Sequence, residues 1–394
     1  MATSGDLKGK SYRGGRWPAA VLVFIFLAVA NCQSGLALAS GSMRASQAVS
    51  PSRQKVWCKA KPDAAWKKVL NGGLVALSRR ASVVPLALAN DEHSFFAEIN
   101  TKAYSGVVRI DAASSQYTGI KRFPDPVNDQ ARGSFDGRWL VWDEYHSLNG
   151  LDDFTVWSWD SRTGRVRQIG AATRSPGWVF WPSSWQAPVA LDGYATWEQG
   201  SGASGLGDVH VVDLGNDRDR VVRRGHVGGS FLADGSLVVW PESMKPGALT
   251  VMRAASARTG RTVATPPRLT DLRGGLAPVT DGKALVYITD EWRSLWWSPS
   301  LEVTPRRVYT APKGDFIENW VHLAGRYVSF TVWNRAYLAD TSSGRYIEIN
   351  PGGDTRLGAK SLALGKPPKK KTMHAIKDVV FLPLKSLPPI PPCE

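Results

Sequence analysis

Apolar and polar residues alternate in short runs along most of the chain, and tight-turn residues separate these runs. In the clearest copy, an Asp-Gly turn lies between two apolar runs within residues 134–142, SFDGRWLVW. Residues 154–169, FTVWSWDSRTGRVRQI, add two further runs around a Thr-Gly turn. Period-two alternation with such turns predicts antiparallel strands joined by tight hairpins. Each copy therefore predicts one four-stranded sheet.

The same unit recurs at regular intervals. The turn aspartates Asp91, Asp136, Asp192, Asp234 and Asp281 are separated by 45, 56, 42 and 47 residues, and a sixth copy turns at Leu323–Gly325. These intervals are typical of propeller blades. A single four-stranded sheet cannot bury both faces, whereas blades packed radially bury them against their neighbours. We therefore predict an all-β fold, a β-propeller over residues 83–384.

Both ends of the chain supply material to close the ring. Residues 374–382 predict two more strands, and residues 74–77 predict an outer strand of the same blade. We expect seven blades, six complete and one composite; six blades with a C-terminal extension are the alternative. The segment 40–82 also predicts a short helix over 63–70, and residues 385–394 form a tail.

The repeat unit resembles the WD40-like blades of TolB-type periplasmic propellers, over roughly residues 83–384. TolB-type proteins carry an α/β domain before the propeller, and the residues that precede the repeats here are too few for one. The resemblance therefore implies the fold and not the translocation role. The Asp-Gly turns also lack the intervening residue of a sialidase-type Asp box, which removes the motif for that activity.

The N-terminal segment has the features of an export signal. Four basic residues between positions 8 and 16 precede the apolar run 17–30, and Ala37-Leu38-Ala39 gives a cleavage pattern. The run is shorter than the roughly 20 residues that span a bilayer. We expect a signal peptide over 1–39 and a secreted, extracytoplasmic protein with no transmembrane span after cleavage. An uncleaved anchor is the alternative.

The net charge of the chain indicates which kinds of partner it attracts. The formal net charge is +15, which attracts anionic partners such as envelope polymers or acidic glycans, although it serves solubility equally well. Export makes nucleic acid an unsuitable partner, and we expect a monomer.

The cysteines predict one disulfide. Cys32 leaves with the signal, whereas Cys58 and Cys393 lie near the two ends of the mature chain. An oxidising compartment predicts a disulfide between them, within the composite blade; two free thiols are the alternative.

Acidic residues follow the predicted second strand in most repeats. The expected members of this acidic rim are Glu98, Asp143, Glu144, Glu198, Glu242, Asp290 and Glu291. Loops after the second strand open on the face that usually binds ligands in WD40-like propellers. The acids would suit Ca²⁺ or a cationic ligand, or glycoside hydrolysis if two lay at the required separation. A rim that is merely solvated is the alternative.

Tryptophans accompany the acids. Those in repeating strand positions, such as Trp142, predict inter-blade core. Trp178, Trp181 and Trp185 instead lie between repeats without strand alternation, and they predict a binding loop. The sequence lacks the HExxH, GxSxG, P-loop, GxGxxG and EF-hand motifs. We therefore expect a non-enzymatic binding module for a protein or envelope polymer, without a required cofactor. A glycan-active hydrolase or lyase that uses the rim carboxylates is the alternative.

Overall fold

The structure is a computed structural model of the 394-residue chain. It describes residues 57–393 apart from 76, 78–81, 125–129, 146–153, 173–186, 202–205, 234–235, 244–250, 267–268, 270–275, 290–291, 319–320, 334, 351–354 and 367–377. The described residues belong to one compact unit, Gln54–Glu394. The predicted signal peptide lies outside them.

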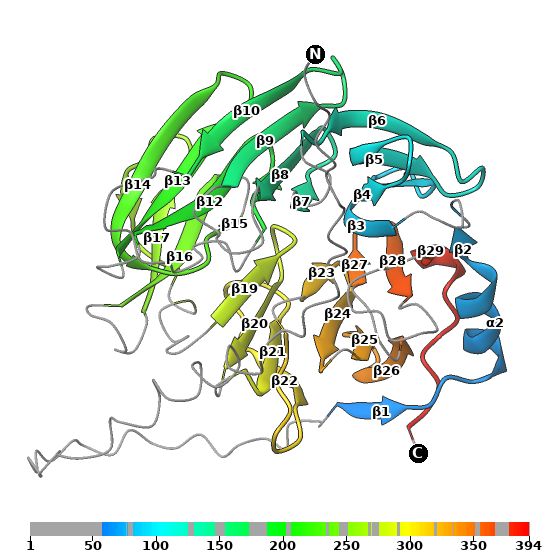
Figure 1. Ribbon diagram of the computed structural model, residues 1–394. Helices are drawn as coiled ribbons and strands as arrows, with labels where there is room; N and C mark the ends of the chain where they lie inside the picture. The colour runs from blue at the N-terminus through cyan, green and yellow to red at the C-terminus, as the bar shows by residue number, and fades with distance from the viewer. Residues whose placement is uncertain are drawn as a thin grey trace, which may run out of the picture. The chain divides into compact units, whose positions relative to one another are not determined.

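The described strands form antiparallel groups of four in chain order (Figure 1). The first blade contains β3 (Ser82–Leu88), β4 (Ser94–Asn100), β5 (Ser105–Asp111) and β6 (Tyr117–Arg122). The second contains β7 (Gln130–Phe135), β8 (Trp139–Tyr145), β9 (Phe154–Asp160) and β10 (Val166–Ala171). The third contains β11 (Val189–Leu191), β12 (Tyr194–Ser201), β13 (Leu206–Asp213) and β14 (Arg218–Val227).

The next groups continue the pattern. The fourth blade contains β15 (Phe231–Ala233), β16 (Leu237–Ser243), β17 (Val251–Ser256) and β18 (Thr262–Val263). The fifth contains β19 (Leu276–Thr280), β20 (Leu285–Thr289), β21 (Ser294–Ser298) and β22 (Arg306–Thr310). The sixth contains β23 (His322–Ala324), β24 (Tyr327–Val332), β25 (Arg335–Asp340) and β26 (Arg345–Asn350). A short pairing of β14 with β16 joins the third and fourth groups into one eight-stranded sheet.

The first strand of each group lies innermost, and these strands form a closed ring. Contacts run from β3 to β7, β11, β15, β19 and β23, then to β27 and back to β3. Figure 1 shows the sheets arranged around this ring. The prediction of an all-β propeller is therefore confirmed.

Apolar side chains between adjacent blades form the core. Phe96, Leu140 and Trp142 belong to one buried cluster between the first and second blades. Phe95 stacks on Phe381 at 5.6 Å between the first and the last. Both faces of a blade are thus covered by its neighbours, which is why apolar residues occupy both strand faces in β4 and β8.

The last group draws strands from both ends of the chain. It contains β27 (Thr355–Leu357), β28 (Ser361–Lys366) and β29 (Asp378–Pro383), and β2 (Leu74–Val75) is its outer strand. Leu74 pairs with Val380 and Val75 with Val379. The expected outer strand is therefore present. The expectation of two strands within 374–382 was wrong, because β27 and β28 begin earlier, around a turn at 358–360 that lacks an Asp-Gly pair.

The N-terminal segment crosses the outside of the last two groups. Asp63 caps helix α2 (Ala64–Gly72) by accepting a hydrogen bond from Trp66 N–H at 2.9 Å, which confirms the predicted helix. The Trp66 indole donates to Pro389 O at 3.0 Å. No helix of the described ranges is long and apolar enough to cross a membrane.

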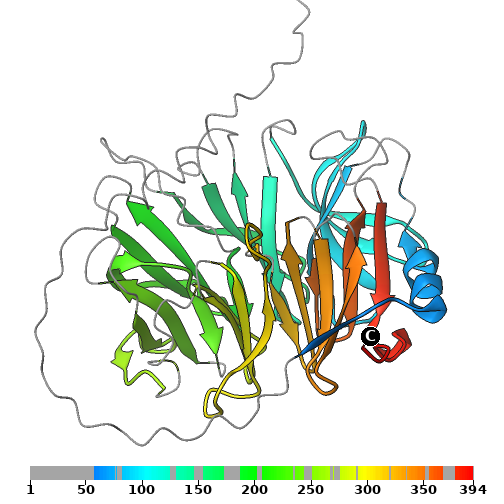
Figure 2. The same ribbon diagram turned by 90° about the horizontal axis from the view of Figure 1, so that it is seen from below.

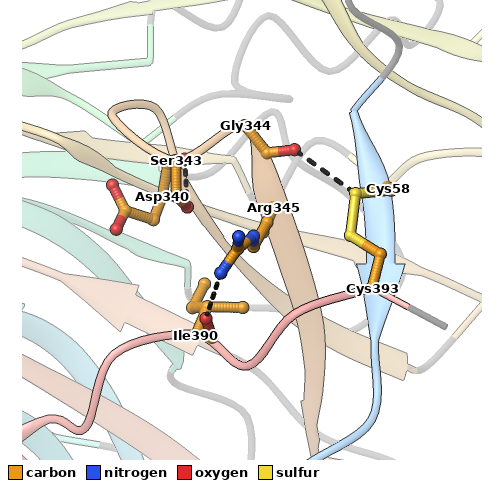
Figure 3. The surroundings of a disulfide bond; sticks show 7 residues. All are labelled: Cys58, Asp340, Ser343, Gly344, Arg345, Ile390 and Cys393. Atoms are coloured by element: carbon orange, nitrogen blue, oxygen red, sulfur yellow. Dashed lines mark hydrogen bonds between the residues drawn. A yellow bond between two sulfur atoms is a disulfide. The ribbon is translucent and has the colours of Figure 1, made fainter.

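The predicted disulfide between Cys58 and Cys393 is present, with Cα atoms 5.9 Å apart (Figure 3). Cys58 begins β1 (Cys58–Ala60), which pairs in parallel with β26 as a fifth strand of the sixth blade. The expectation that Cys58 lies in the composite blade was therefore wrong. The chain reaches the edge of the sixth blade first and joins the last blade only at β2.

Candidate functional site

Strand direction gives the propeller two different faces. One face, the turn face, carries the short hairpins between first and second and between third and fourth strands, such as 136–138 and 161–165. The opposite face, the loop face, carries the connections from second to third strands and from one blade to the next. These vary in length: residues 172–188 separate β10 from β11, whereas residues 333–334 separate β24 from β25. In Figure 2 the hairpin between β21 and β22, in yellow, marks the turn face at the lower edge.

The turn aspartates hold the turn face together. Asp136 Oδ1 accepts hydrogen bonds from Arg138 N–H and Trp139 N–H at 2.8 and 2.7 Å, while its Oδ2 accepts from Gly193 N–H of the next blade at 2.9 Å. Asp281 repeats this pattern, and its Oδ2 accepts from Gly325 N–H at 3.0 Å. At Asp136 and Asp281 the recurring turn residue therefore joins adjacent blades, whereas Asp91 accepts hydrogen bonds from His93 and Ser94 of its own blade.

The described members of the predicted acidic rim lie within second strands, near their ends. Glu98 of β4 accepts a hydrogen bond from Ala131 N–H at 2.8 Å, and Glu198 of β12 accepts one from Ser230 N–H at 2.7 Å. In each pair the donor belongs to the neighbouring blade or directly precedes it. These two carboxylates therefore link blades in equivalent ways.

Two acids on β8 are buried with cations. Asp143 is 1% exposed; Arg132 Nη2 lies 3.0 Å from its Oδ2, and the Tyr145 hydroxyl donates to the same oxygen at 2.7 Å. Burial raises the pKa of Asp143 to about 6, although Arg132 opposes the rise. Glu144 is fully buried and pairs with Lys121 Nζ of the first blade at 2.7 Å.

Glu198 and Glu242 complete the described members of the set. Burial raises the pKa of Glu198 to about 8, while the Ser230 N–H and the charge of Arg132 act in the opposite direction. Glu242 contacts Arg223 of the preceding blade, and Arg253 Nε lies 3.9 Å from its Oε2. Only Asp143 and Glu198 share a cation, because Arg132 acts on both.

The remaining predicted residues fall where no placement is described. Asp290 and Glu291 lie outside the described residues, as do Trp178, Trp181 and Trp185. Within the described ranges, no three His, Cys, Asp or Glu side chains come together as a set of metal ligands.

The repeating tryptophans separate into two kinds. Trp142, Trp197 and Trp240 are at most 4% exposed and belong to the inter-blade core, as predicted. Trp333, which directly follows β24, is instead 55% exposed. It meets Phe316 edge-on at 5.4 Å, and Phe316 is 41% exposed.

Sequence reasoning missed Phe316 and placed Trp333 with the core. The available signal was the departure of the sixth repeat, where Trp333-Asn334 replaces an acid after the second strand. The backbone of Trp333 has φ of +44°, a left-handed conformation that non-glycine residues seldom adopt. The Phe316–Trp333 pair lies on the loop face because it joins a blade-to-blade connection to a second-to-third-strand hairpin.

No family model matches the chain, and no curated protein matches it in sequence. Solved structures with similar folds include a prolyl endopeptidase, with a TM-score of 0.48 and 16% identity over 76% of this chain and 46% of that one. This chain therefore spans about half the length of that protein.

Two further similar structures cover most of both chains. An oligogalacturonate lyase from Vibrio parahaemolyticus has a TM-score of 0.48 and 10% identity over 73% of this chain and 87% of that one. A chain of the mitotic checkpoint complex has a TM-score of 0.44 and 12% identity over 89% and 98%. The sheet topology itself identifies this chain as a β-propeller.

Proposed function

We propose that this protein is an exported binding module that engages a protein or an envelope polymer through its loop face. The observation that carries the proposal is the Phe316–Trp333 pair, two large apolar side chains that are 41% and 55% exposed on that face. Aromatic side chains that a partner can cover supply much of the free energy of binding at interfaces. Both rings are held in place before any ligand arrives.

Backbone conformation supports the same role for Trp333. A non-glycine residue in the left-handed region costs about 1 kcal/mol or more, and such residues gather at ligand-binding sites. Trp333 has a φ of +44°, although its side chain is half exposed. Since a half-exposed side chain stabilises the core little, the strained backbone favours a role of Trp333 in recognition.

The contacts of the strand acids support binding over the hydrolase or lyase alternative. Glu98 and Glu198 accept hydrogen bonds from the neighbouring blade's backbone, and Glu144 pairs with Lys121. Carboxylates with such structural partners are poorly available to a sugar, and glycoside hydrolysis needs two that are accessible. The pairing of Asp143 with Arg132 acts in the same direction.

The proposal also includes export of the protein and its membership of the TolB-type propellers. The Cys58–Cys393 disulfide is typical of an oxidising, extracytoplasmic compartment, and the apolar run at 17–30 is typical of a signal peptide that ends at residue 39. The recurrent Asp-Gly hairpins support membership of the TolB-type, WD40-like propellers. The translocation role of that group is not part of the proposal.

The test compares Trp333→Ala with the matched control Tyr117→Ala, an aromatic side chain that is 39% exposed on the outer strand β6. A phage-displayed random peptide library and an oligosaccharide array first select probes that bind the wild-type protein. We expect Trp333→Ala to weaken the selected probes at least tenfold, the effect of losing a buried aromatic at an interface. Tyr117→Ala should leave binding within about twofold.

Two outcomes would count against the proposal. Equal losses in the two variants would remove the Phe316–Trp333 pair from the binding site. Cleavage of an array oligosaccharide by the wild-type protein, lost in Glu198→Gln and retained in Trp333→Ala, would favour the hydrolase or lyase alternative.

A further inference from the structure

An arginine stands at the start of the fourth strand in each of five consecutive blades. Arg218, Arg306 and Arg345 are the first residues of β14, β22 and β26. Arg165 and Arg261 directly precede β10 and β18, and their carbonyl oxygens accept from Asp160 N–H and Ser256 N–H at the ends of the adjoining strands. Arg165, Arg218, Arg261 and Arg345 stand opposite the last residue of the third strand, whereas Arg306 pairs with Trp297, one residue before the end of β21. These residues therefore lie near corresponding corners of successive blades at the turn face, with Arg306 displaced by one residue.

Four of these five arginines are exposed and uncommitted. Arg165, Arg218, Arg261 and Arg306, here called the arginine arc, are exposed to solvent. Within the described part of the chain, none of the four has a hydrogen-bond or ion-pair partner for its side chain. Arg345 differs, because its Nη1 donates to Ile390 O at 3.2 Å beside the disulfide (Figure 3). The arc therefore spans the second to the fifth blade.

Acids near the arc have other partners. Asp160 holds Arg138 through two hydrogen bonds of 2.8 and 3.1 Å. Asp213 accepts from Gly215 N–H at 3.0 Å and from the Asn216 side chain at 2.9 Å. Their charges are thus engaged locally, and the arc keeps a positive field that attracts anions from solution.

A cavity of about 210 Å³ opens at one end of the arc, between the turns of the second and third blades. Arg138, Arg165 and Arg167 line it together with Trp139, Thr163 and two acids, Asp160 and Asp217. Asp160 holds Arg138 and Asp217 pairs with Arg167, so that Arg165 is the arginine of this lining that has no acid partner among the described residues. The guanidinium carbons of Arg138 and Arg167 lie 4.6 and 5.2 Å from the Trp139 ring, so that the indole holds two cations in place. Burial, and to a smaller extent repulsion from Arg165, lower the pKa of Arg167.

We propose that the turn face binds a linear polyanion along the arginine arc, with one anionic group of that polymer held by Arg165 at the cavity between the second and third blades. The regular spacing of the blades presents a row of single cations, which matches a chain of discrete carboxylate, sulfate or phosphate groups. A recessed cavity favours a polymer over a planar lipid surface, because headgroups held in a plane cannot enter it. This surface is separate from the loop face, and the proposal does not depend on the function proposed above.

The test measures binding of heparin, alginate and polyphosphate, which carry sulfate, carboxylate and phosphate groups respectively. The variant R165Q/R218Q/R261Q/R306Q removes the arc. The matched control K67Q/K68Q/K102Q/K313Q removes the same number of charges from exposed lysines on α2 and in the connections at 101–104 and 311–321. We expect the arc variant to bind its best polyanion roughly 30-fold more weakly, from four surface charge contacts, and the control to remain within about threefold.

The cavity is tested by single variants. Arg165→Gln should weaken binding more than Arg306→Gln, because only Arg165 lines the cavity. Equal effects of the two would overturn the role of the cavity. Equal losses in the arc and control variants would overturn the arc, because net charge alone would then explain binding.

Two further measurements distinguish polyanion binding along the arginine arc from binding to a lipid surface and from binding at the loop face. Vesicles of phosphatidylglycerol and phosphatidylcholine in equal parts should bind weakly. Strong vesicle binding that the arc variant abolishes would overturn the polymer in favour of a planar anionic surface. Trp333→Ala should leave polyanion binding unchanged, and a failure of the loop-face proposal would leave this expectation intact.

Discussion

The two faces of the propeller are built by different means. On the turn face, short hairpins recur with the same side-chain contacts, such as the bonds from Asp136 and Asp281 to the next blade. On the loop face, connections differ in length from blade to blade, and the Phe316–Trp333 pair is exposed, whereas the Tyr145–Phe154 pair at the end of β8 is buried. Residues that recur in each repeat therefore stabilise the packing of the blades, whereas we expect ligand recognition at residues that depart from the repeat.

The comparison also predicts where stability resides. The disulfide belongs to the turn face, because Cys58 N–H donates to Gly344 O of a third-to-fourth-strand hairpin at 3.2 Å. Substitutions at the turn face and between blades should therefore change the free energy of unfolding. Substitutions of the exposed aromatic pair should change binding.

The largest effect is expected from removing the disulfide. The double variant Cys58→Ser/Cys393→Ser should lower the free energy of unfolding by about 5 kcal/mol, because the bond closes a loop with a sequence separation of 335 residues. Urea unfolding with and without reductant measures the loss. Reductant should destabilise the wild-type protein and leave the variant unchanged; a variant as stable as the wild type would contradict the role of the bond.

The next largest effect depends on pH. The pKa of Glu198 is about 8 in the folded protein against 4.5 for an ordinary glutamate, so the unfolded chain releases this proton first. Stability should fall as pH rises from about 5 to about 8, by roughly 3 kcal/mol from this residue. Glu198→Gln keeps the acceptor for Ser230 N–H and should remove that part of the pH dependence.

Urea unfolding at several pH values measures this dependence. Glu302→Gln, a substitution at an exposed glutamate in the hairpin before β22, is the control and should follow the wild-type curve. If Glu198→Gln also follows the wild-type curve, Glu198 does not hold a proton in the folded state.

A smaller effect is expected at a single turn. Asp136→Ala removes three hydrogen bonds to backbone N–H groups, one of them from the next blade, and should cost about 2 kcal/mol. Asp315→Ala, at the loop face, should cost less than about 0.5 kcal/mol. Thermal unfolding of both variants measures the difference, and equal losses would abolish the distinction between the faces.

The smallest effect on stability is expected at the loop face. Trp333→Ala should change the free energy of unfolding by less than about 0.5 kcal/mol, because the indole is 55% exposed and its backbone is already strained. Urea unfolding checks this. A loss of several kcal/mol would mean that the indole supports the fold and would weaken the case for a binding role.

Much of the propeller could be predicted from sequence, because Asp-Gly turns and alternation are local signals. The outer strand at Leu74–Val75 was found in this way, as was the helix that Asp63 caps. The position of Cys58 could not be predicted, since parallel pairing of β1 with β26 leaves no local pattern. The turn at 358–360 was missed for lack of an Asp-Gly pair.

The candidate site was less predictable. The acids were expected to form a rim at the ends of the second strands, yet Asp143 and Glu144 are buried within β8, where Arg132 and Lys121 pair with them from neighbouring strands. Those partners are distant in sequence or belong to another blade, so alternation alone cannot identify them. Phe316 was missed because it lies in a connection without periodicity, and its partner Trp333 occupied a position where tryptophan is usually core.

The pairing of N-terminal with C-terminal strands constrains the order in which the protein can fold. Strand β1 needs β26, β2 needs β29, and Cys58 needs Cys393, so the first structured residues acquire their partners only after the last ones exist. A chain that crosses a membrane N-terminus first must therefore keep residues 58–75 unpaired until its final residues arrive. Closure of the ring and oxidation of the cysteines become the last events of folding, and a truncated or stalled chain is left open and reduced.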